Sequence, residues 1–400
     1  MSLRVLVLHS QYASGASSGE NRVVEDEAAL LAEHGHDVRL ETPVPDDGSA
    51  AARLTLGARA VWSRRTTRMV RRIEQEWRPD VIHVHNLFPQ LSPAVLRGTG
   101  APVVLTLHNY RLLCLPATFL RDGRQCEKCL GRGLSAGVRH RCYRGSLAGS
   151  ASLATSISVH RALGTFGAVD RFVAVSGFVR DKYVSAGFAS ERIAVKPNFV
   201  APTGRRDGPG SDFLYLGRLS EEKGLEPLLR LWGDVPGTLR IVGEGPEGDR
   251  LRSIAPPNVE FAGAVPPGDV PALLRSSRAL VLPSICYEGA PRTVVEAFAA
   301  GVPVIGSRRG AIPEFVSHGD TGALAEPGVA EEWHAAVEML NRDEESVRMG
   351  GNAHHAWREL YSPQRAIEAL EGVYADVIAR GVRNGSKEPR LGPAVPSIDQ

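Results

Sequence analysis

The chain has 400 residues, of which 43% are hydrophobic, 23% charged and 6% aromatic, and its formal net charge is +2. This length exceeds what one hydrophobic core usually supports, and the composition excludes a disordered or fibrous protein. No apolar run reaches the roughly 20 residues needed to cross a bilayer, and the opening MSLRVLVLHS is too short for a signal peptide. We therefore expect a two-domain cytoplasmic protein.

Short apolar runs alternate with amphipathic stretches throughout the sequence. This pattern predicts an α/β protein in which parallel sheets are covered on both faces by helices. In the first half of the chain the predicted strands are Arg4–His9, Val38–Thr42, Val81–His85, Val103–His108 and Arg171–Ser176.

A loop rich in small residues follows the first predicted strand, with Gly15 and Gly19 ahead of a helix. Such a loop lets a phosphate or sugar approach the backbone closely, although most Gly/Ser loops are ordinary turns. The full G-x-G-x-x-G spacing is absent, which disfavours an enzyme that uses a nicotinamide cofactor.

The segment 58–75 is strongly basic. Six arginines fall within one predicted helix that also has apolar residues for its other side: Arg59, Arg64, Arg65, Arg68, Arg71 and Arg72, with Val61, Trp62, Met69, Val70 and Ile73. A basic amphipathic helix suits an anionic lipid surface, such as the inner face of the membrane, but a solvated helix face fits equally well. Because we find no nucleic-acid-binding motif, we expect no nucleic-acid partner.

Histidines end two of the predicted strands, His83 and His85 on one and His108 on the next. The ends of parallel strands are where such sheets present side chains to ligands. A histidine at a strand end is commonly a structural hydrogen-bonding group, and it can also contact a substrate.

Four of the five cysteines fall in a segment at about 110–145: Cys114, Cys126, Cys129 and Cys142. The spacing C-x11-C-x2-C-x12-C offers the ligand set of a tetrahedral structural zinc site, and a cytosolic location disfavours disulfides. Reduced buried thiols and a redox or iron–sulfur role are the alternatives. We expect Cys286 to be a packing residue.

The second half repeats the alternation. Between the halves, residues 201–211 form a Gly/Pro/Arg stretch without periodicity, which predicts a linker with hinge motion. We therefore expect Rossmann-like domains at 1–200 and 201–380, with a last helix ending near Arg380 and a disordered tail at 381–400. The predicted strands of the second domain are Phe213–Leu216, Thr238–Val242, Val259–Ala262, Ala279–Leu282 and Pro303–Gly306.

The segment YLGRLSEEKG, at 215–224, places Gly217, Arg218 and Lys223 where a strand gives way to a helix. In open α/β sheets ligands bind beyond the carboxyl ends of strands, and a helix start there adds backbone donors for anions. Arg and Lys together can hold a diphosphate and neutralise it as it leaves. Taken singly, either residue would be an ordinary surface charge.

The segment CYEGAPRTVVEAFAAGVPVIGS, at 286–307, carries Glu288 and Glu296. If a helix begins near Pro291, Glu296 lies in its early turns and Glu288 in the preceding loop, so both can point into one pocket. The backbone N–H groups of residues 289–293 would then meet phosphate or sugar oxygens. Either glutamate taken alone would be read as solvated.

Together these segments resemble the retaining GT-B glycosyltransferases of glycosyltransferase family four, of the bacterial polysaccharide and glycoconjugate type with a four-cysteine insertion. GRLSEEKG matches the family's Gly-Arg-Leu…Lys-Gly element, and Glu288-x7-Glu296 matches its paired-glutamate signature, although the intervening GAPRTVV departs from the aromatic or glycine residues often found there. VGEGPEG, AVSGFVRD and KPNFV also look like family elements. The resemblance implies two Rossmann-like domains facing across a cleft, with a C-terminal helix that crosses back.

The resemblance also implies roles for individual residues. Arg218 and Lys223 would hold the donor diphosphate, Glu288 would approach the transferring sugar, Glu296 would take the ribose hydroxyls, and His108 would contact the sugar or reacting centre. His85 and Asn86 are candidates for the acceptor side. The donor-binding candidates are Gly19, Gly217, Arg218, Lys223, Gly243, Gly263, Glu288, Gly289, Ala290, Pro291, Arg292, Thr293 and Glu296.

We therefore expect a hexosyltransferase that moves a sugar from a UDP- or GDP-linked donor to a saccharide, lipid-linked or natural-product hydroxyl with retention. The sequence has no D-x-D element, so we expect fixed charges to replace a catalytic metal. Two alternatives stay open: a sugar-nucleotide epimerase of GT-B fold and a non-catalytic sugar-nucleotide-binding protein.

Overall fold

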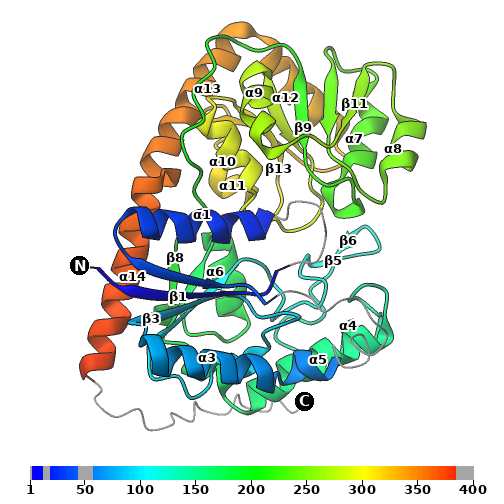
Figure 1. Cartoon of the computed structure of the whole chain (residues 1–400). Helices are drawn as coiled ribbons and strands as arrows, with labels where there is room; N and C mark the ends of the chain where they lie inside the picture. Colours follow the sequence, from blue (N-terminus) through cyan, green and yellow to red (C-terminus); the bar gives the residue numbers. More distant parts are fainter. Residues whose placement is uncertain (1, 12–18, 44–56, 384–400) are drawn as a thin grey trace. The chain divides into compact units, whose positions relative to one another are not determined.

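The computed structural model describes residues 2–11, 19–43 and 57–383. Contacts divide the chain into two compact units, each built around a six-stranded sheet flanked by helices (Figure 1). Unit 1 comprises residues 1–117, 127–196 and 367–400, and unit 2 comprises residues 118–126 and 197–366.

The sheet of unit 1 has the strand order β2-β1-β3-β4-β7-β8, and every pairing in it is parallel. Its central strands are buried and mostly apolar, because helices cover both faces of a parallel sheet. The strands are β1 (Arg4–His9), β2 (Asp37–Glu41), β3 (Val81–Asn86), β4 (Val103–Leu107), β7 (Arg171–Ala174) and β8 (Ile193–Val195).

Helices α1 (Gly19–Glu33) and α3 (Arg64–Trp77) lie on opposite faces of this sheet (Figure 1). The predicted basic helix is interrupted at residues 62–63, so that residues 57–61 form a separate helical segment. The Ser63 side chain accepts from the N–H of Thr66 and caps α3. The other helices are α4 (Ser135–Arg139), α5 (Leu147–Ala162) and α6 (Gly177–Ser185).

The last helix, α14 (Pro363–Arg383), groups with unit 1 from Ile367 onward. Tyr374 is fully buried there and its hydroxyl lies 2.7 Å from Nδ1 of His83, while Asp376 pairs with Arg171. These contacts place the end of α14 with the first sheet, as the crossing-back helix of the family resemblance implied, although the predicted domain bounds of 201–380 counted it with the second domain. The predicted disordered tail beyond Arg383 lies outside the described residues.

The sheet of unit 2 has the order β11-β10-β9-β12-β13-β14, also parallel throughout. Large side chains such as Phe213, Trp232 and Trp333 fill its core. Its strands are β9 (Phe213–Leu216), β10 (Leu239–Val242), β11 (Val259–Gly263), β12 (Ala279–Leu282), β13 (Val304–Ser307) and β14 (Gly322–Ala325). A separate antiparallel hairpin joins β5 (Leu120–Arg121) and β6 (Arg124–Gln125).

The helices of unit 2 follow its strands, as in a doubly wound fold. They are α7 (Leu225–Trp232), α8 (Gly248–Ile254), α9 (Val270–Ser276), α10 (Arg292–Ala299), α11 (Ile312–Phe315), α12 (Ala330–Asn341) and α13 (Asp343–Ala356), with a π-helical turn at Trp357–Tyr361. No helix among the described residues is long and apolar enough to span a membrane.

The predicted strands are confirmed to within one or two residues at each end, but β8 and β14 were missed because a strand of only three or four residues carries no clear pattern. The predicted linker at 201–211 is part of unit 2. Arg206 in it is 7% exposed, and its guanidinium donates to the carbonyls of Pro209, Ser277 and Arg278. Because these bonds fix the segment to the second sheet, the change of unit falls earlier, after Lys196.

Candidate active site

The sheet of unit 2 reverses its order of strand addition between β9 and β12. In doubly wound sheets this switch point, at the carboxyl ends of the strands, is where ligands bind. The loop after β9 carries Arg218 and Lys223, and the loop after β12 carries Glu288. The strand order therefore brings together two segments that lie about 65 residues apart in the chain.

Lys223 and Glu288 form an ion pair across the switch point. Lys223 Nζ lies 2.7 Å from Glu288 Oε1, and the Ser284 hydroxyl donates to the same oxygen at 2.6 Å. Burial opposes both charges, but the attraction of Glu288 outweighs it and raises the pKa of Lys223, and Lys223 in turn lowers the pKa of Glu288. Both groups are thus charged at neutral pH, and a lysine with three donors keeps others for a ligand.

Two glycines let these loops approach each other. Gly224 has φ +69, and a Cβ there would lie 2.1 Å from the carbonyl oxygen of Pro283. Gly310 has φ +58, and a Cβ there would lie 2.5 Å from the backbone N and O of Glu288. Only glycine fits at either position, so local backbone freedom sets the place of the ion pair.

Arg218 is exposed, and its side chain makes no ion pair with any carboxylate of the described residues. The glycines predicted to bind the donor follow neighbouring strand ends, where the N–H of Gly217 donates to Val242 and that of Gly243 to Gly263. Those two N–H groups are therefore used within the fold. The side chains of Arg218 and Lys223 supply positive charge for an anion at this edge.

Helix α10 begins at Arg292, directly after Pro291, as the sequence predicted. Glu296 lies in its second turn and accepts a hydrogen bond from Nε of Arg292 at 2.8 Å. Thr293 lies in the first turn of the same helix, whereas Pro291 has no N–H and is excluded as a backbone donor. The preceding loop contains Gly289 and Ala290.

The hairpin from the cysteine-rich segment packs beside this loop. The Tyr287 hydroxyl donates to Gln125 Oε1 at 2.9 Å, and the ring of Tyr287 lies 5.9 Å from that of Phe119. A groove of about 540 Å³ runs between the hairpin and the starts of α7 and α8. The insertion thus shapes the surface next to Glu288.

In unit 1 the switch point lies between β1 and β3, and histidines gather there. His9 ends β1, His85 lies near the end of β3, and His108 follows β4. His85 Nδ1 lies 2.9 Å from His108 Nε2, and burial lowers the pKa of His108 to about 4. Gly19 starts α1, and the rest of its glycine loop, with Gly15, lies outside the described residues.

Asn86, a candidate for the acceptor side, forms hydrogen bonds within the fold. Its amide nitrogen donates to the carbonyl of Ser10, and its amide oxygen accepts from the N–H of Phe88. No sequence pattern assigned a role to Glu27 or Lys196, which form a buried ion pair. The available signal was a glutamate on the apolar face of α1, between Val24 and Leu31.

The cysteines fall into both units. Cys114, Cys129 and Cys142 belong to unit 1 and Cys126 to unit 2. Cys142 donates its N–H to the carbonyl of Gly137, and a Cβ at Gly137 would lie 3.5 Å from Cys129 Sγ. Among the described residues, no three cysteine sulfurs lie within 4.8 Å of one another. Cys286 is buried, as expected of a packing residue.

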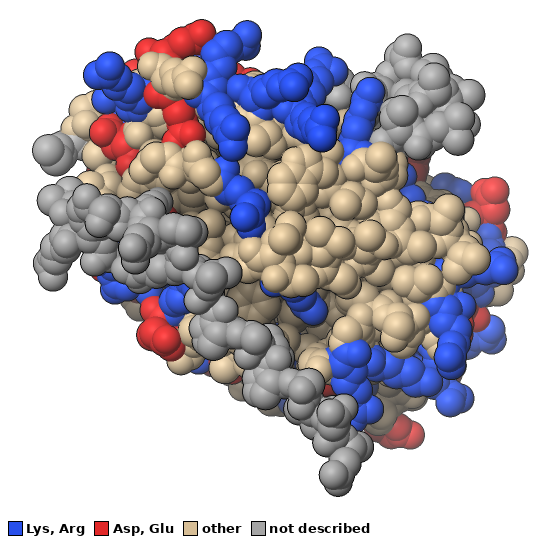
Figure 2. Space-filling model, turned by 90° about the horizontal axis from the view of Figure 1, so that it is seen from below, with Lys and Arg blue, Asp and Glu red and all other residues tan. Residues whose placement is uncertain are grey.

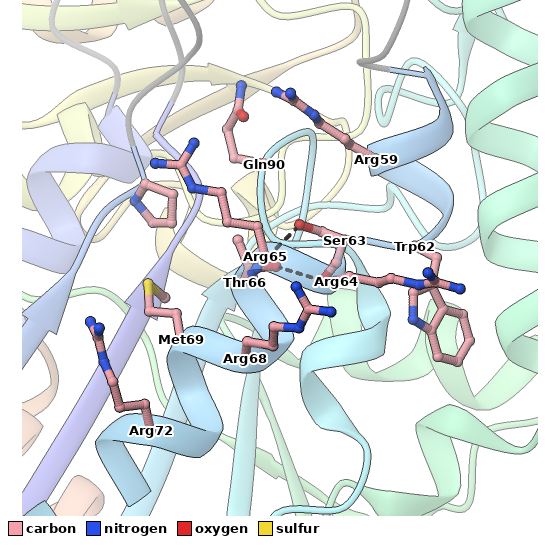
Figure 3. Close-up of a pocket in the computed structure, with 11 residues that line it drawn as sticks. Arg59, Trp62, Ser63, Arg64, Arg65, Thr66, Arg68, Met69, Arg72 and Gln90 are labelled. Atoms are coloured by element: carbon pink, nitrogen blue, oxygen red, sulfur yellow. Dashed lines mark hydrogen bonds between the residues drawn. The ribbon is translucent and has the colours of Figure 1, made fainter. Parts of the chain in front are cut away.

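The outer face of α3 borders a groove of about 1030 Å³. Figure 3 shows Arg65, Arg68 and Arg72 extending from successive turns of α3, with Trp62 and Arg64 at its start. Figure 2 shows Lys and Arg side chains gathered on this face around an uncharged area, with few acidic side chains. The groove is lined by Pro43, Arg59, Trp62, Ser63, Arg64, Arg65, Thr66, Arg68, Met69, Arg72 and Gln90.

Two doubly wound parallel sheets, one of them with paired charges at its switch point, define an α/β protein of the class that binds phosphorylated ligands at strand ends. The family model "Glycosyltransferase Family 4" matches residues 17–203, and the model "Glycosyl transferases group 1" matches residues 202–356. Together they cover most of the chain, which therefore belongs to the glycosyltransferases of family four.

Individual relatives agree with this membership. The chain is 34% identical over 161 residues to N-acetyl-alpha-D-glucosaminyl L-malate synthase of Bacillus anthracis, which covers 38% of this chain and 40% of that protein. It is 27% identical to glycogen synthase of Mycobacterium tuberculosis over 82% of this chain and 74% of that protein. The chain thus spans less than half of the first relative and about three quarters of the second.

Solved structures share the fold. Sucrose-phosphate synthase of Thermosynechococcus elongatus superimposes with a TM-score of 0.70 at 16% identity, over 94% of this chain and 100% of that one. HepE of Anabaena, solved with UDP and glucose, gives a TM-score of 0.62 at 17% identity, over 93% of this chain and 100% of that one. The chain shares its fold, which is GT-B, with these proteins.

Proposed function

We propose that this glycosyltransferase moves a hexose from a nucleotide-diphosphate sugar to the hydroxyl of a saccharide, a lipid-linked saccharide or a natural product, with retention at the anomeric carbon. The observation that carries the proposal is the Lys223–Glu288 pair at the switch point of unit 2, with Arg218 on the same loop as Lys223. Two cations at the ends of parallel strands suit a diphosphate. UDP is the favoured nucleotide because HepE was solved with it, and GDP is the alternative.

Each charged group has a role in this reaction. Arg218 and Lys223 bind the diphosphate and stabilise the charge that develops as the bond to the sugar breaks. Glu288 approaches the sugar, Glu296 binds the ribose hydroxyls, and His108 contacts the reacting sugar. The departing phosphate accepts the proton of the incoming hydroxyl, so no side chain is assigned as general base. Fixed charges thus replace a catalytic metal.

The first experiment is a thermal-shift screen against UDP-, GDP-, ADP- and TDP-sugars. A ligand that binds only the folded state raises the apparent stability, so one nucleotide series should raise Tm and the others should not. With that donor, NMR of the product then reads the anomeric configuration. Conversion of the donor without any acceptor would support an epimerase, and binding without turnover would support a non-catalytic protein.

We further propose that the α3 groove contacts an anionic membrane surface. Arg64, Arg65, Arg68 and Arg72 are exposed, and none forms an ion pair with a carboxylate of the described residues. Trp62 is 41% exposed at the start of the same face, where an aromatic ring can enter the lipid interface. A basic residue near an anionic surface contributes roughly 1 kcal/mol.

Vesicle co-sedimentation tests this contact. The protein should bind vesicles rich in phosphatidylglycerol, bind phosphatidylcholine vesicles weakly, and detach as salt rises. Arg65→Glu with Arg68→Glu should weaken binding at least about tenfold, since two attractive charges become repulsive. The matched control reverses two exposed arginines of unit 2, Arg342→Glu with Arg358→Glu, and should bind like the wild type. Equal loss in both variants would contradict a role for α3.

We also propose that the four cysteines hold a structural zinc ion. Thiolate sulfurs are the ligands that such sites use. Cys129 Sγ and the backbone of Cys142 both lie close to Gly137. Elemental analysis should find about one zinc per chain, lost in Cys126→Ser. A fully active protein without zinc would contradict this proposal.

A further inference from the structure

A buried cluster of charged and polar side chains lies beneath the strand ends of unit 1. Glu27 of α1 and Lys196, which follows β8, are each 2% exposed, and Lys196 Nζ lies 2.5 Å from Glu27 Oε2. Two histidines of β3 face the other carboxylate oxygen, with His83 Nδ1 at 3.3 Å and His85 Nε2 at 3.4 Å from Oε1. A buried ion pair contributes little net stability, which suggests another role for it.

The cluster has the spacing of a metal site, because Glu27, His83 and His85 offer three ligand atoms within 4.8 Å of one another. Both ring nitrogens of His83 are already engaged, however, Nδ1 with Tyr374 Oη and Nε2 with Thr106 Oγ1, each at 2.7 Å. The Lys196 ammonium on Glu27 would also repel a metal ion. A hydrogen-bond network therefore explains the cluster better than a metal.

The histidines in this network are neutral at physiological pH. Burial lowers the pKa of His83 and of His108 to about 4 and holds the pKa of His85 well below its usual value, although Glu27 opposes the shift at His83 and His108. Glu20 favours the charged form of His108, while His9 and Lys196 disfavour it. Each neutral imidazole has one N–H and one lone pair, so the contacts determine which nitrogen carries the hydrogen.

The bond between His85 and His108 joins two imidazoles, with 2.9 Å between His85 Nδ1 and His108 Nε2. If His85 Nδ1 carried the hydrogen, the lone pair of His85 Nε2 would face Glu27 Oε1, a buried oxygen with no aligned donor among the described residues. A hydrogen on His85 Nε2 turns that repulsion into attraction. His85 Nδ1 then accepts, and His108 Nε2 donates.

We propose that Lys196, Glu27 and His85 act as positioning residues for His108: they orient its ring and hold the Nε2–H tautomer, so that Nδ1 accepts a hydroxyl hydrogen of the reacting sugar. The inference rests on the proposed function, since it gives His108 a substrate contact. His108 is only partly buried, and the described residues offer its Nδ1 no hydrogen-bond partner. The network thus leaves one lone pair, in a fixed direction, at the end of β4.

The tautomers can be read directly by 15N NMR of histidine-labelled protein, with resonances assigned from His85→Gln and His108→Asn. His85 and His108 should both show a protonated Nε2 and an unprotonated Nδ1 at neutral pH, and neither ring should titrate near its usual pKa, because burial lowers the pKa of both. A protonated Nδ1 on His108, or titration of either ring near its usual pKa, would overturn the proposal. This measurement does not depend on transferase activity.

Kinetics test the consequence for the reaction. His85→Phe removes the hydrogen bond to His108 and should lower kcat at least about tenfold, while UDP binding, which depends on unit 2, stays within about twofold. His85→Gln keeps an acceptor and should retain more activity. The matched control is His36→Phe, which removes a buried histidine bonded to the Leu3 N–H and to Glu371 elsewhere in unit 1, and it should leave kcat unchanged.

The outcomes separate this inference from the proposed function. If the wild-type protein did not bind UDP, the proposed donor would be contradicted, but the NMR measurement would still determine the tautomers of His85 and His108. Unchanged kcat in His85→Phe would overturn the positioning role. If the wild type bound one metal ion per chain and His85→Gln did not, the cluster would be a metal site and the proposed hydrogen-bond network would be wrong.

Discussion

Replacing Lys223 by methionine tests the ion pair at the switch point of unit 2. Removing one partner of a fully buried pair costs about 3–5 kcal/mol. Here the side chains of Lys223 and Glu288 are 27% and 13% exposed, and Ser284 still donates to Glu288, so solvent and hydroxyl offset part of the loss. We expect Lys223→Met to lower the free energy of unfolding by about 1–3 kcal/mol.

The same variant should lose donor affinity. A charge-assisted hydrogen bond contributes about 1.5–3 kcal/mol, so UDP should bind at least about tenfold more weakly. Adding Glu288→Gln removes the stranded carboxylate and should restore stability to within about 1 kcal/mol of the wild type, without restoring affinity. Urea unfolding and calorimetric titration with UDP measure the two effects separately.

A second lysine–glutamate pair provides the control. Lys182 lies 2.5 Å from Glu127 in unit 1, so Lys182→Met removes the same chemical group from a site without a proposed ligand. Its UDP affinity should stay within about twofold of the wild type. If a folded Lys223→Met protein bound UDP as tightly as the wild type, the assignment of the diphosphate site would be wrong.

Three further predictions follow from the geometry. His83 and His108 have pKa values of about 4 in the fold and 6.5 when unperturbed, so the unfolded chain binds more protons than the folded one between these pH values. The free energy of unfolding should therefore fall as the pH drops from about 6.5 to 4, by up to roughly 3 kcal/mol for each histidine. Urea midpoints that stayed constant across this range would contradict the prediction. Gly310→Ala should destabilise the fold by about 1–3 kcal/mol and reduce transfer, because the added Cβ meets the backbone of Glu288, whereas a wild-type Tm would show that the loop relaxes freely. Glu296→Gln should abolish the preference for UDP over 2′-deoxy-UDP if its carboxylate binds the ribose, and calorimetry in which that preference persisted would remove this role.

Local patterns were sufficient for most of the fold. Apolar runs such as those of β1, β9 and β12 predicted strands with correct ends, because a buried parallel strand is mostly apolar and stops near a polar or turn residue. The start of α10 after Pro291 was equally readable, since proline favours the first turn of a helix. Residues 201–211 were predicted to be a linker because the stretch is rich in Gly and Pro. That composition gives no sign that Arg206 is buried and hydrogen-bonded to the carbonyls of Ser277 and Arg278.

The sequence by itself determined the alternating elements, the order of the motifs and the residue types available at each strand end. Only the tertiary structure decided which of those side chains meet: Lys223 with Glu288 across the switch point, and Lys196 with Glu27 in the buried cluster of unit 1. The physical reason is that crossover connections set the order of strands in a sheet, so residues 65 and 169 positions apart become neighbours without any local signal.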